Sequence, residues 1–591
     1  MKELEYPFDA DYILQHKKSI KKTFADAEGL AEKRIAIVTG STVGETKNVL
    51  ELFLLNQGIR PVFWEGEYNL FYEDIVFAND ELVEFKPDII YIHTTNKNLI
   101  NLPLPGDDEN AFNEKLEAEF SRFKTVWEKA EENFHCPVIQ NNFENYEYRL
   151  LGNRDCFDYG GVGRFINAMN MKMGDYALSH KSFFINDLSY EASVIGLDKW
   201  FDYSKWYLFK YPFSFEAIPF VAFNISNIIK AIYGKNKKAL ALDLDNTMWG
   251  GVVGDDGVEN IAVGIESPAG MPFSSMQSYV KKLSLTGVAL NLCSKNDPQI
   301  GLTGFDHPSS ELQADDFIIK KVNWENKDQN IHGIAKELNI GEDSIVFIDD
   351  NPAERQIVED NTICTVMPYE VPDNAVSVLD RSGFFESLGI SEEDKKRSQY
   401  YRDNLKRASE MAEFSDYSEY LKSLNMKGYF TPIDEKNIQR ATQLINKTNQ
   451  FNLTTKRYTI EEVEQFVADK NSFSVCGRLE DKYGDNGIVT ILMAEQNGKE
   501  ANIKLWLMSC RVFKRELEFA MFDRLCDMAR ARGIEKLKGE YIRTKKNGLV
   551  SDFYGSLGFV KVAGDDDMSS WEYSLENKTG NMTDAMEVIV E

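Results

Sequence analysis

A short apolar run that ends in two acids, Ala239-Leu-Ala-Leu-Asp-Leu-Asp-Asn-Thr247, constrains the fold of this chain more than any other stretch. The four residues at its start predict a buried β-strand, and Asp243 and Asp245 follow directly, where the chain turns. A parallel α/β sheet presents its reactive groups at the carboxyl ends of its strands. Two carboxylates so close together suit cation binding and phosphoryl transfer, with one acid as nucleophile and the other as proton donor and acceptor.

Three segments further along the chain supply the other groups that this chemistry needs. The next strand ends at Cys293-Ser-Lys-Asn296, which places the Ser294 hydroxyl where it can bond a phosphoryl oxygen. Trp324-Glu-Asn-Lys327 opens a helix and offers an ammonium group, and Val346-Phe-Ile-Asp-Asp-Asn351 again places acids after an apolar strand. One Asp-x-Asp pair alone is better explained as a turn or a helix cap. Four motifs in this order, each at the end of a strand or helix, favour catalysis.

In content and order these motifs resemble those of the haloacid dehalogenase superfamily of phosphatases. The resemblance implies that Asp243 is the nucleophile, that Asp245 is the general acid and base, and that Ser294 and Lys327 bind the phosphate. A proton donor two residues after the nucleophile lets an aspartyl phosphate turn over. Dehalogenases and ion pumps lack this donor, so the resemblance implies a phosphatase.

The same resemblance implies a Mg²⁺ cofactor. Asp243 and Asp349 would bind the ion through their carboxylates and Asp245 through its backbone carbonyl, with water and substrate phosphate completing the octahedron. The cation would screen anions that otherwise repel one another and would stabilise the phosphoryl oxygens in the transition state. Three neighbouring residues are expected to support the site: Thr247, Asp350 and Asn351.

The spacing of the motifs limits what can cover this site. Asp243 and Ser294 are 51 positions apart, and Ser294 and Asp349 are 55 apart, which the strands and helices of the core largely consume. A large cap domain therefore does not fit. The glycine-rich segment Met248–Gly257 is expected to form a short flap hairpin instead. An open site needs a flanking domain or a bulky partner to exclude water.

Longer stretches around the motifs look like the FkbH-like (HAD-IIIC) proteins. They comprise Leu242–Gly257, Cys293–Asn296, Asn323–Lys327 and Phe347–Arg355 in the core, and Asn141–Glu144, Tyr148–Gly152 and Trp200–Leu208 before it. The resemblance implies transfer of a glyceryl group from 1,3-bisphosphoglycerate to an acyl carrier protein with loss of phosphate. Cys293 could serve as a thiol acceptor there, although a small core residue is the favoured interpretation.

Three functions stay open at this point. The first is a Mg²⁺-dependent phosphatase that acts through an aspartyl phosphate on a small phosphorylated metabolite. The second is the FkbH-like transfer to a carrier protein. The third is a non-catalytic scaffold, against which the intact set of acids argues.

The alternation of strands and helices predicts an α/β multidomain protein. A doubly wound α/β domain is expected over residues 1–233, and the central, capless Rossmann-like domain that carries the motifs over 234–376. They are followed by a charged helical linker over 377–422, an α+β domain over 423–575 and a loose acidic tail over 576–591.

The first domain resembles the SGNH-hydrolase fold, with Ser41 after its first strand and Asn141 or Asn142 at a later strand end. A serine esterase also needs an imidazole base oriented by an acid. The late Asp-x-x-His of that family is absent here, where Asp202-Tyr-Ser-Lys205 stands nearest. The domain is therefore expected to be a non-catalytic scaffold or docking module.

The last domain is similar to the GNAT-type N-acetyltransferase fold, on the strength of Leu505–Cys510 before a long helix and the late Phe553–Phe559. That fold holds the pyrophosphate of coenzyme A at a helix N-terminus, through a loop that contains glycine. The loop here is Arg511-Val-Phe-Lys-Arg-Glu516, which has three cations and no glycine. The change puts acetyl transfer in doubt, and leaves contact with an acidic carrier or a solvated helix start as alternatives.

Composition narrows the choice of partners and compartment. The formal net charge of −28 opposes binding to nucleic acid or anionic lipid. The charged start of the chain lacks an apolar signal segment, and no run of eighteen apolar residues indicates a membrane span. Seven scattered cysteines fit neither a zinc pattern nor a disulfide framework. We therefore expect a cytoplasmic protein with reduced thiols.

Overall fold

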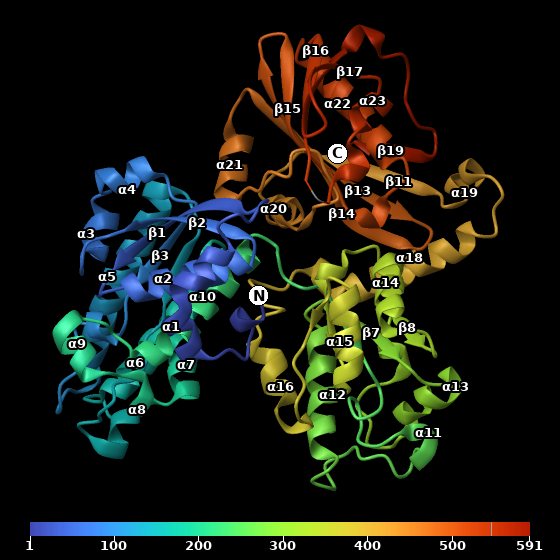
Figure 1. Cartoon of the computed structure of the whole chain (residues 1–591). Helices are drawn as coiled ribbons and strands as arrows, with labels where there is room; N and C mark the ends of the chain where they lie inside the picture. Colours follow the sequence, from blue (N-terminus) through green and yellow to red (C-terminus); the bar gives the residue numbers. More distant parts are fainter. Residues whose placement is uncertain (545, 591) are drawn as a thin grey trace. The chain divides into compact units, whose positions relative to one another are not determined.

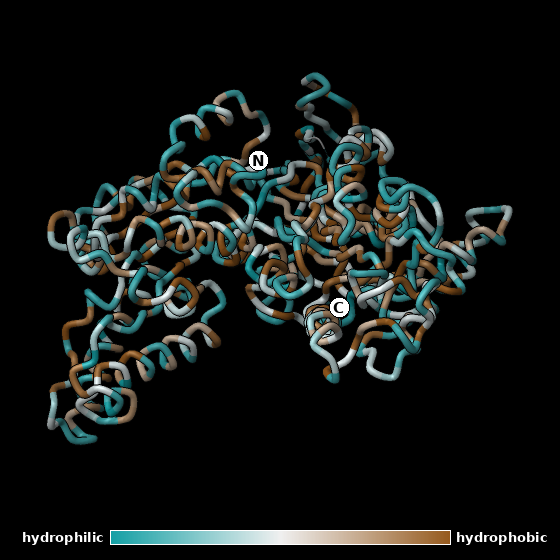
Figure 2. Tube along the Cα trace, turned by 60° about the horizontal axis from the view of Figure 1, so that its bottom comes forward, coloured by the Kyte–Doolittle hydropathy of each residue, from teal (hydrophilic) through white to brown (hydrophobic). Residues whose placement is uncertain are grey.

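The computed structural model describes residues 1–544 and 546–590. The chain divides into two compact units, Met1–Ile232 and Tyr233–Glu591. Figure 1 shows three sheets, one in the first unit and two in the second. Hydrophilic and hydrophobic segments alternate along the whole trace (Figure 2), as expected where every layer packs against another.

The sheet of the first unit is entirely parallel, in the order β2-β1-β3-β4-β5. Its strands are β1 (Ala31–Thr39), β2 (Ile59–Glu65), β3 (Ile89–His93), β4 (Val138–Asn141) and β5 (Phe183–Asn186). The order reverses between β1 and β3, which is the place where doubly wound sheets bind ligands. This is the doubly wound α/β layer that the sequence predicts.

Helices cover both faces of this first sheet. On one face α1 (Ala10–Thr23), α2 (Gly44–Asn56) and α10 (Ile218–Ile232) pack together, and on the other α3 (Phe71–Val76), α5 (Glu109–Phe134) and α6 (Val162–Ser179) do so. The segment Phe215–Ile232, which includes α10, is long and apolar enough to cross a membrane by length and composition alone. Two thirds of that segment is buried inside the unit, as in the core helix of a globular domain.

The central sheet is also parallel, in the order β10-β9-β6-β7-β8. Its strands are β6 (Ala239–Leu242), β7 (Ala289–Ser294), β8 (Ile319–Val322), β9 (Ile345–Ile348) and β10 (Thr365–Val366). All four residues of β6 are buried because its side chains alternate between two cores. Leu240 and Leu242 pack towards α12 (Met271–Ser284) and α16 (Pro372–Arg381), whereas Ala239 and Ala241 pack towards α14 (Lys327–Leu338) and α15 (Pro352–Asn361).

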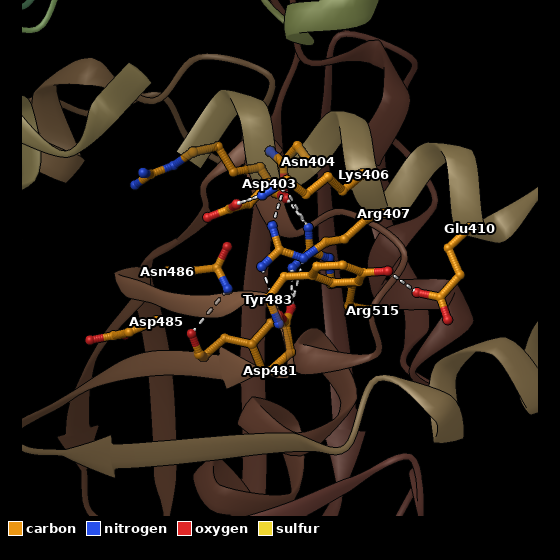
Figure 3. A network of polar contacts seen from close by, with 12 residues as sticks. Asp403, Asn404, Lys406, Arg407, Glu410, Asp481, Tyr483, Asp485, Asn486 and Arg515 are labelled. Atoms are coloured by element: carbon orange, nitrogen blue, oxygen red, sulfur yellow. Dashed lines mark hydrogen bonds and ion pairs between the residues drawn. The ribbon is translucent and has the colours of Figure 1, made fainter. Parts of the chain in front are cut away.

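The expected linker contains three helices, and the longest of them is docked on the third sheet. It contains α17 (Glu392–Lys395), α18 (Arg397–Met411) and α19 (Tyr417–Ser423). The Asp481 carboxylate accepts a bidentate pair of hydrogen bonds from Arg407 of α18, at 2.7 and 2.9 Å, and one from Arg515 at 3.1 Å. Figure 3 shows these groups together with Asn404, which accepts from both arginines. The side chains of Asp481 and Arg407 are 0 and 4 % exposed, so the network fixes α18 on the third sheet.

The third sheet has nine strands and is mixed. Its main path runs β17-β18-β16-β15-β14-β13-β11-β19, and β12 (Phe451–Asn452) pairs with β15. The other strands are β11 (Met426–Thr431), β13 (Ser472–Asp481), β14 (Gly484–Asn497), β15 (Glu500–Met508), β16 (Lys536–Ile542), β17 (Val560–Gly564), β18 (Met568–Ser574) and β19 (Met586–Val590). The helices α20 (Ile438–Lys447), α21 (Ile460–Ala468), α22 (Leu517–Ala531) and α23 (Phe553–Ser556) complete this α+β part.

The prediction of a loose tail over 576–591 is wrong for part of that segment. Residues 586–590 form β19, which pairs in parallel with β11. Upstream of the strand, the Lys578 ammonium lies 2.6 Å from the Asp523 carboxylate, with both side chains largely buried. The backbone hydrogen bonds of β11 and this ion pair order a segment whose acidic composition alone indicates disorder.

The linker and the third sheet attach to the amino edge of the central sheet. The Asn339 side chain donates to the Cys510 carbonyl at 2.6 Å, and the Cys510 thiol lies 3.0 Å from the Asn339 carbonyl. Lys546 forms an ion pair with Asp343, and Arg397 donates to the Gly287 carbonyl at 3.1 Å. The residues that the central part contributes to these contacts, Asn339, Asp343 and Gly287, come just before β9 or β7 in the sequence. They therefore lie at the amino ends of the strands, opposite to Asp243.

Candidate functional site

The acids predicted from the sequence meet at the carboxyl edge of the central sheet. Asp243 follows β6 and Asp349 follows the neighbouring strand β9, whose last residues are paired in register. The Asp243 amide donates to the Ile348 carbonyl at 3.0 Å, which fixes the two strand ends side by side. One carboxylate oxygen from each of Asp243, Asp349 and Asp350 lies within 4.8 Å of the others.

Lys327 bridges two of these acids from the first position of α14. Its ammonium donates to the Asp243 carboxylate at 2.7 Å and also to the Asp349 carboxylate. Burial lowers the pKa of Lys327, but Asp243 and Asp349 raise it by more, so the net direction is upward and the ammonium stays charged. Burial and the nearby Asp243 raise the pKa of Asp349 to about 6, against the opposing effect of Lys327.

The donor set fits a divalent cation. Three carboxylates and one ammonium leave two negative charges in a site where Asp349 is fully buried and Asp243 nearly so. Uncompensated buried charge is costly. All three convergent ligand atoms are carboxylate oxygens, the donors that Mg²⁺ prefers.

Asp245 lies outside this group of three acids, as its different predicted role requires. One carboxylate oxygen accepts from the Trp249 indole at 2.9 Å and from the Val253 amide at 3.0 Å, and the other accepts from the Asn296 side chain at 2.8 Å. Burial raises the pKa of Asp245 above its ordinary value, and the bonds from Val253 and Trp249 oppose that effect. The carboxyl group is therefore held in one orientation beside the acids that it does not join.

The loop that orients Asp245 is not the predicted flap hairpin. Residues 248–263 contain one turn of helix, α11 (Val253–Asp256), and are closed by a single bridge between Gly250 and Ala262. The Trp249 side chain is fully buried, with its ring 5.2 Å from that of Phe305. A Cβ on Gly304 would lie 2.4 Å from the Trp249 ring, which explains the glycine there. Within the described residues, no separate cap domain interrupts the strands and helices of the core.

Ser294 and Cys293 end β7 beside these acids. Ser294 is 2 % exposed and stands at the strand terminus that the sequence predicts. Cys293 is fully buried, its thiol points to the Lys327 carbonyl at 3.6 Å, and burial raises its pKa well above the ordinary value. A buried thiol that remains protonated is a poor nucleophile, so the geometry favours the core interpretation of Cys293.

The three supporting residues hold the turn after β9. The Asp350 amide donates to the Thr247 hydroxyl at 3.2 Å, and the Asn351 amide donates to the Asp349 carboxylate at 2.8 Å. The Asn351 side chain then caps α15 by accepting from the Ala353 amide. Arg355, one turn into that helix, donates to the backbone carbonyls of Asp349 and Asp350.

Sequence reasoning named no role for Asn296, Trp249 or Arg355, although all three stand inside quoted motifs. Trp249 stands 4 and Asn296 stands 51 positions after Asp245, and neither spacing belongs to a periodic pattern that would mark the residue. Arg355 carried a weak signal, because a cation in the first turn of a helix that starts at a strand end is unusual. The structure shows that each of the three orients an acid or its backbone.

The first unit places its predicted serine in a sealed position. Ser41 is fully buried and its hydroxyl has no hydrogen-bond partner among the described residues. The loop that carries it is tied down, since Thr42 bonds to the Phe209 and Lys210 carbonyls at the end of α9 (Tyr203–Phe209). The Asn141 side chain donates to the Thr94 carbonyl, and Asn142 bonds to Asp187. No substrate can reach Ser41 in this conformation.

One histidine of the first unit, His93, lies on the strand next to the one that leads to Ser41, but it is not set up as a base. His93 is the last residue of β3, where it pairs with Thr39 of β1. Its side chain is fully buried, and burial lowers its pKa to about 3. Its Nδ1 contacts the Tyr91 hydroxyl at 2.8 Å, and that hydroxyl also donates to Asn141. No carboxylate is recorded against this ring among the described residues, so the acid–base–serine series of an esterase is incomplete.

Two of the three cations in the loop before α22 are already engaged. Arg515 is buried against Asp481, and the Arg511 guanidinium lies 4.6 Å from the centre of the Tyr400 ring. Lys514 is exposed. Among the described residues of this loop, Asp481 therefore neutralises Arg515, whereas Lys514 and Arg511 have no acidic partner.

Fold and site together define an α/β multidomain protein whose central parallel sheet gathers three carboxylates and a lysine ammonium at the carboxyl ends of its strands. Residues 46–230 match the family model described as the N-terminal domain of FkbH. The predicted resemblance to FkbH-like proteins and the predicted α/β multidomain class are both confirmed at this level.

Comparison with solved structures finds a further similarity. The N-terminal part of a Bacteroides fragilis protein, containing a phosphatase domain and complexed with Mg, is 29 % identical with a TM-score of 0.59; the match covers 63 % of this chain and 99 % of that one. The ribosomal-protein-S18-alanine N-acetyltransferase from Escherichia coli is 13 % identical with a TM-score of 0.21, over 26 % of this chain and 98 % of that one. No curated protein matches the chain.

Proposed function

We propose that the central part of this chain is a Mg²⁺-dependent phosphatase that works through an aspartyl phosphate on Asp243, with a small phosphorylated metabolite as substrate. One observation carries the proposal: carboxylate oxygens of Asp243, Asp349 and Asp350 converge within 4.8 Å, with the Lys327 ammonium bonded to two of them. The similarity to a phosphatase domain complexed with Mg supports it.

The groups around Asp243 fit each step of such a reaction. An Asp243 oxygen attacks phosphorus, and the bond from phosphorus to the leaving alcohol oxygen breaks as Asp245 gives that oxygen a proton. Asp245 then takes a proton from water, which attacks the aspartyl phosphate and releases inorganic phosphate. Lys327 and Ser294 bind phosphoryl oxygens throughout. The bonds from Trp249, Val253 and Asn296 keep Asp245 aimed at the place where the alcohol leaves.

Mg²⁺ would be held by Asp243, Asp349, the Asp245 backbone carbonyl and, from its place in the cluster, Asp350. When bound, it supplies charge neutralisation for the phosphoryl oxygens and for the acids themselves. The carboxylates of Asp243, Asp349 and Asp350 together with the Lys327 ammonium carry two excess negative charges, which a divalent ion would balance.

Phosphate release from a generic aryl phosphate tests the proposal. Asp243→Asn should abolish Mg²⁺-dependent release, because the amide cannot form the acyl phosphate. Asp255→Asn, on the exposed surface of the loop that contains α11, is the matched control and should keep wild-type activity. Equal activity in wild type and Asp243→Asn would refute the assignment.

A second candidate is favoured by the match of residues 46–230 to the N-terminal domain of FkbH. In this version the substrate is 1,3-bisphosphoglycerate and the glyceryl group passes to the thiol of an acyl carrier protein as phosphate leaves. Incubation with both, followed by the intact mass of the carrier, separates the two candidates. An adduct that depends on Asp243 supports transfer, and phosphate release without an adduct supports hydrolysis.

The intact acids speak against a purely non-catalytic scaffold. We further propose a cytoplasmic protein that does not bind nucleic acid, since a net charge of −28 repels polyanions. The proposed reaction needs no membrane.

A further inference from the structure

A group of five cations lies at the amino edge of the central sheet, where α17, α18 and α20 meet. We call it the junction cluster, and it comprises Lys238, Arg397, Arg440, Lys447 and Arg511. Each member interacts electrostatically with at least one other, and Lys447 interacts with all four. A concentration of positive charge is unexpected in a chain whose net charge is −28.

Among the described residues, two carboxylates form or approach ion pairs with the junction cluster. Asp394 pairs with Arg397 and, at 3.3 Å, with Lys447. Glu393 approaches the Arg440 Nε at 3.9 Å, too far for a hydrogen bond. Asp343 also acts on Lys238, but it is already paired with Lys546. In the part of the chain that the structure describes, Lys238 and Arg511 have no ion-pair partner, so three positive charges are left uncompensated when all five cations are protonated.

Arg440 shows most directly that a partner is missing. Its side chain is 12 % exposed, and its Nε–H is buried without a hydrogen-bond acceptor in the described structure. Buried guanidinium donors are normally satisfied, because an unpaired charged donor costs more than a neutral one. Burial, and then the cations around it, lower the pKa of the neighbouring Lys447 to about 6. Without a counter-ion, the cluster therefore disfavours the protonated form of Lys447.

We propose that the junction cluster binds a phosphate-bearing anion, supplied either as inorganic phosphate or pyrophosphate or as the phosphate groups of an organic ligand. Three excess charges match a polyanion better than a single carboxylate, and arginine forks suit the several acceptor oxygens of a phosphate. The side chains of Arg397 and Lys447 are 21 and 36 % exposed, so solvent and ligand reach the group. The site is distinct from the Asp243 site, which lies at the opposite edge of the same sheet.

Thermal unfolding of the full chain tests the site without relying on activity. Inorganic pyrophosphate, added in EDTA at constant ionic strength, should raise the Tm of the wild type in a saturable way, whereas sodium chloride at matched ionic strength should not. EDTA keeps the response separate from metal-dependent binding at Asp243, and Asp243→Asn should respond as the wild type does.

Two substitutions, one in the junction cluster and one in a neighbouring acid, should change the Tm of the free protein in opposite directions. Arg440→Gln should raise the Tm of the free protein, because it relieves repulsion, and should reduce the pyrophosphate shift at least fivefold. Glu393→Gln should lower the Tm of the free protein and increase pyrophosphate affinity, because it removes one of the two acids. Arg478→Gln is the control: this exposed arginine is already paired with Asp485 in the same part of the chain.

Titration calorimetry identifies the source of the phosphate. ADP and coenzyme A, which contain a pyrophosphate, are compared with free pyrophosphate; tenfold tighter binding of an organic ligand would assign the site to that ligand. The proposal is overturned if wild type shows no saturable shift with any of these anions. It is also overturned if Arg440→Gln lowers the Tm equally with and without them.

Discussion

Asp243 and Asp245 are the same amino acid two positions apart, yet the groups that surround their carboxylates suit them to different roles. Asp243 faces Lys327 and two further acids, whereas Asp245 is bonded by Trp249 and Asn296. The two acids and the lysine could be predicted from the sequence, because each stands at the end of a strand or the start of a helix. The orienting residues could not, because the loop conformation that brings Trp249 and Asn296 to one carboxylate has no counterpart in residue spacing.

Asn296→Ala should lower kcat of the proposed phosphatase about ten- to hundredfold with little change in KM. The substitution removes the 2.8 Å bond to Asp245 but touches none of the phosphate-binding groups, and a general acid contributes about 10²- to 10⁴-fold in all. Steady-state kinetics measures the effect, with Asn260→Ala as control, because Asn260 is an exposed amide in the 248–263 loop that orients Asp245. A rise in KM at constant kcat would assign Asn296 to substrate binding instead.

Glu144, in the first unit, predicts a pH dependence of stability. Burial raises its pKa to about 7, above the 4.5 of an exposed glutamate, and one of its oxygens has no partner in the described structure. The folded state therefore binds a proton more tightly than the unfolded state, and the stability from this group is lost as the pH rises from 4.5 through 7. Glutamine carries no ionisable group, so Glu144→Gln does not suffer this loss. The loss of unfolding free energy that it avoids amounts to roughly 3 kcal/mol at pH 8.

The Tm difference between Glu144→Gln and wild type should accordingly become more positive from pH 5 to pH 8, as measured by calorimetry. Glu128→Gln, an exposed glutamate of α5, should show no such trend. A difference that stays constant over this range would mean that Glu144 is ionised at no cost.

At the scale of elements, apolar runs and capped helices were predictable and short or polar strands were not. The predicted strand 239–242 agrees with β6, and the helix predicted to open at Trp324–Lys327 agrees with α14. The strand β8, with two lysines in four residues, and β19, in an acidic tail, are specified by pairing with neighbours far along the chain. Likewise, charge alone predicts that α18 is solvated, whereas Arg407 docks it on Asp481.

Asp481→Asn should destabilise the second unit by about 3 to 5 kcal/mol, because it leaves Arg407 and Arg515 buried without a counter-ion. Denaturant unfolding followed by tryptophan fluorescence measures the loss. Asp485→Asn, which breaks an exposed pair with Arg478, should cost less than about 1 kcal/mol. Equal effects of the two substitutions would show that burial adds nothing to the first pair.

At the scale of the whole molecule, the α/β multidomain class was readable from the sequence, but the contacts that attach its parts to one another were not. Asn339 and Cys510, which join the central sheet to the last part, are 171 positions apart, and neither belongs to a recognisable motif. Such contacts depend on surfaces that exist only after each part has folded. For the same reason the sequence could not reveal the junction cluster, whose five members come from four separate segments.

The joint at Asn339 and Cys510 has a consequence for how this protein can be varied. The last part contacts the central sheet at the amino ends of its strands, away from Asp243. Exchanging this part for another module would therefore leave the geometry of the reaction centre in place. Diversity in that module and constancy in the acids can therefore coexist in one lineage, and engineered chimaeras can exploit the same freedom.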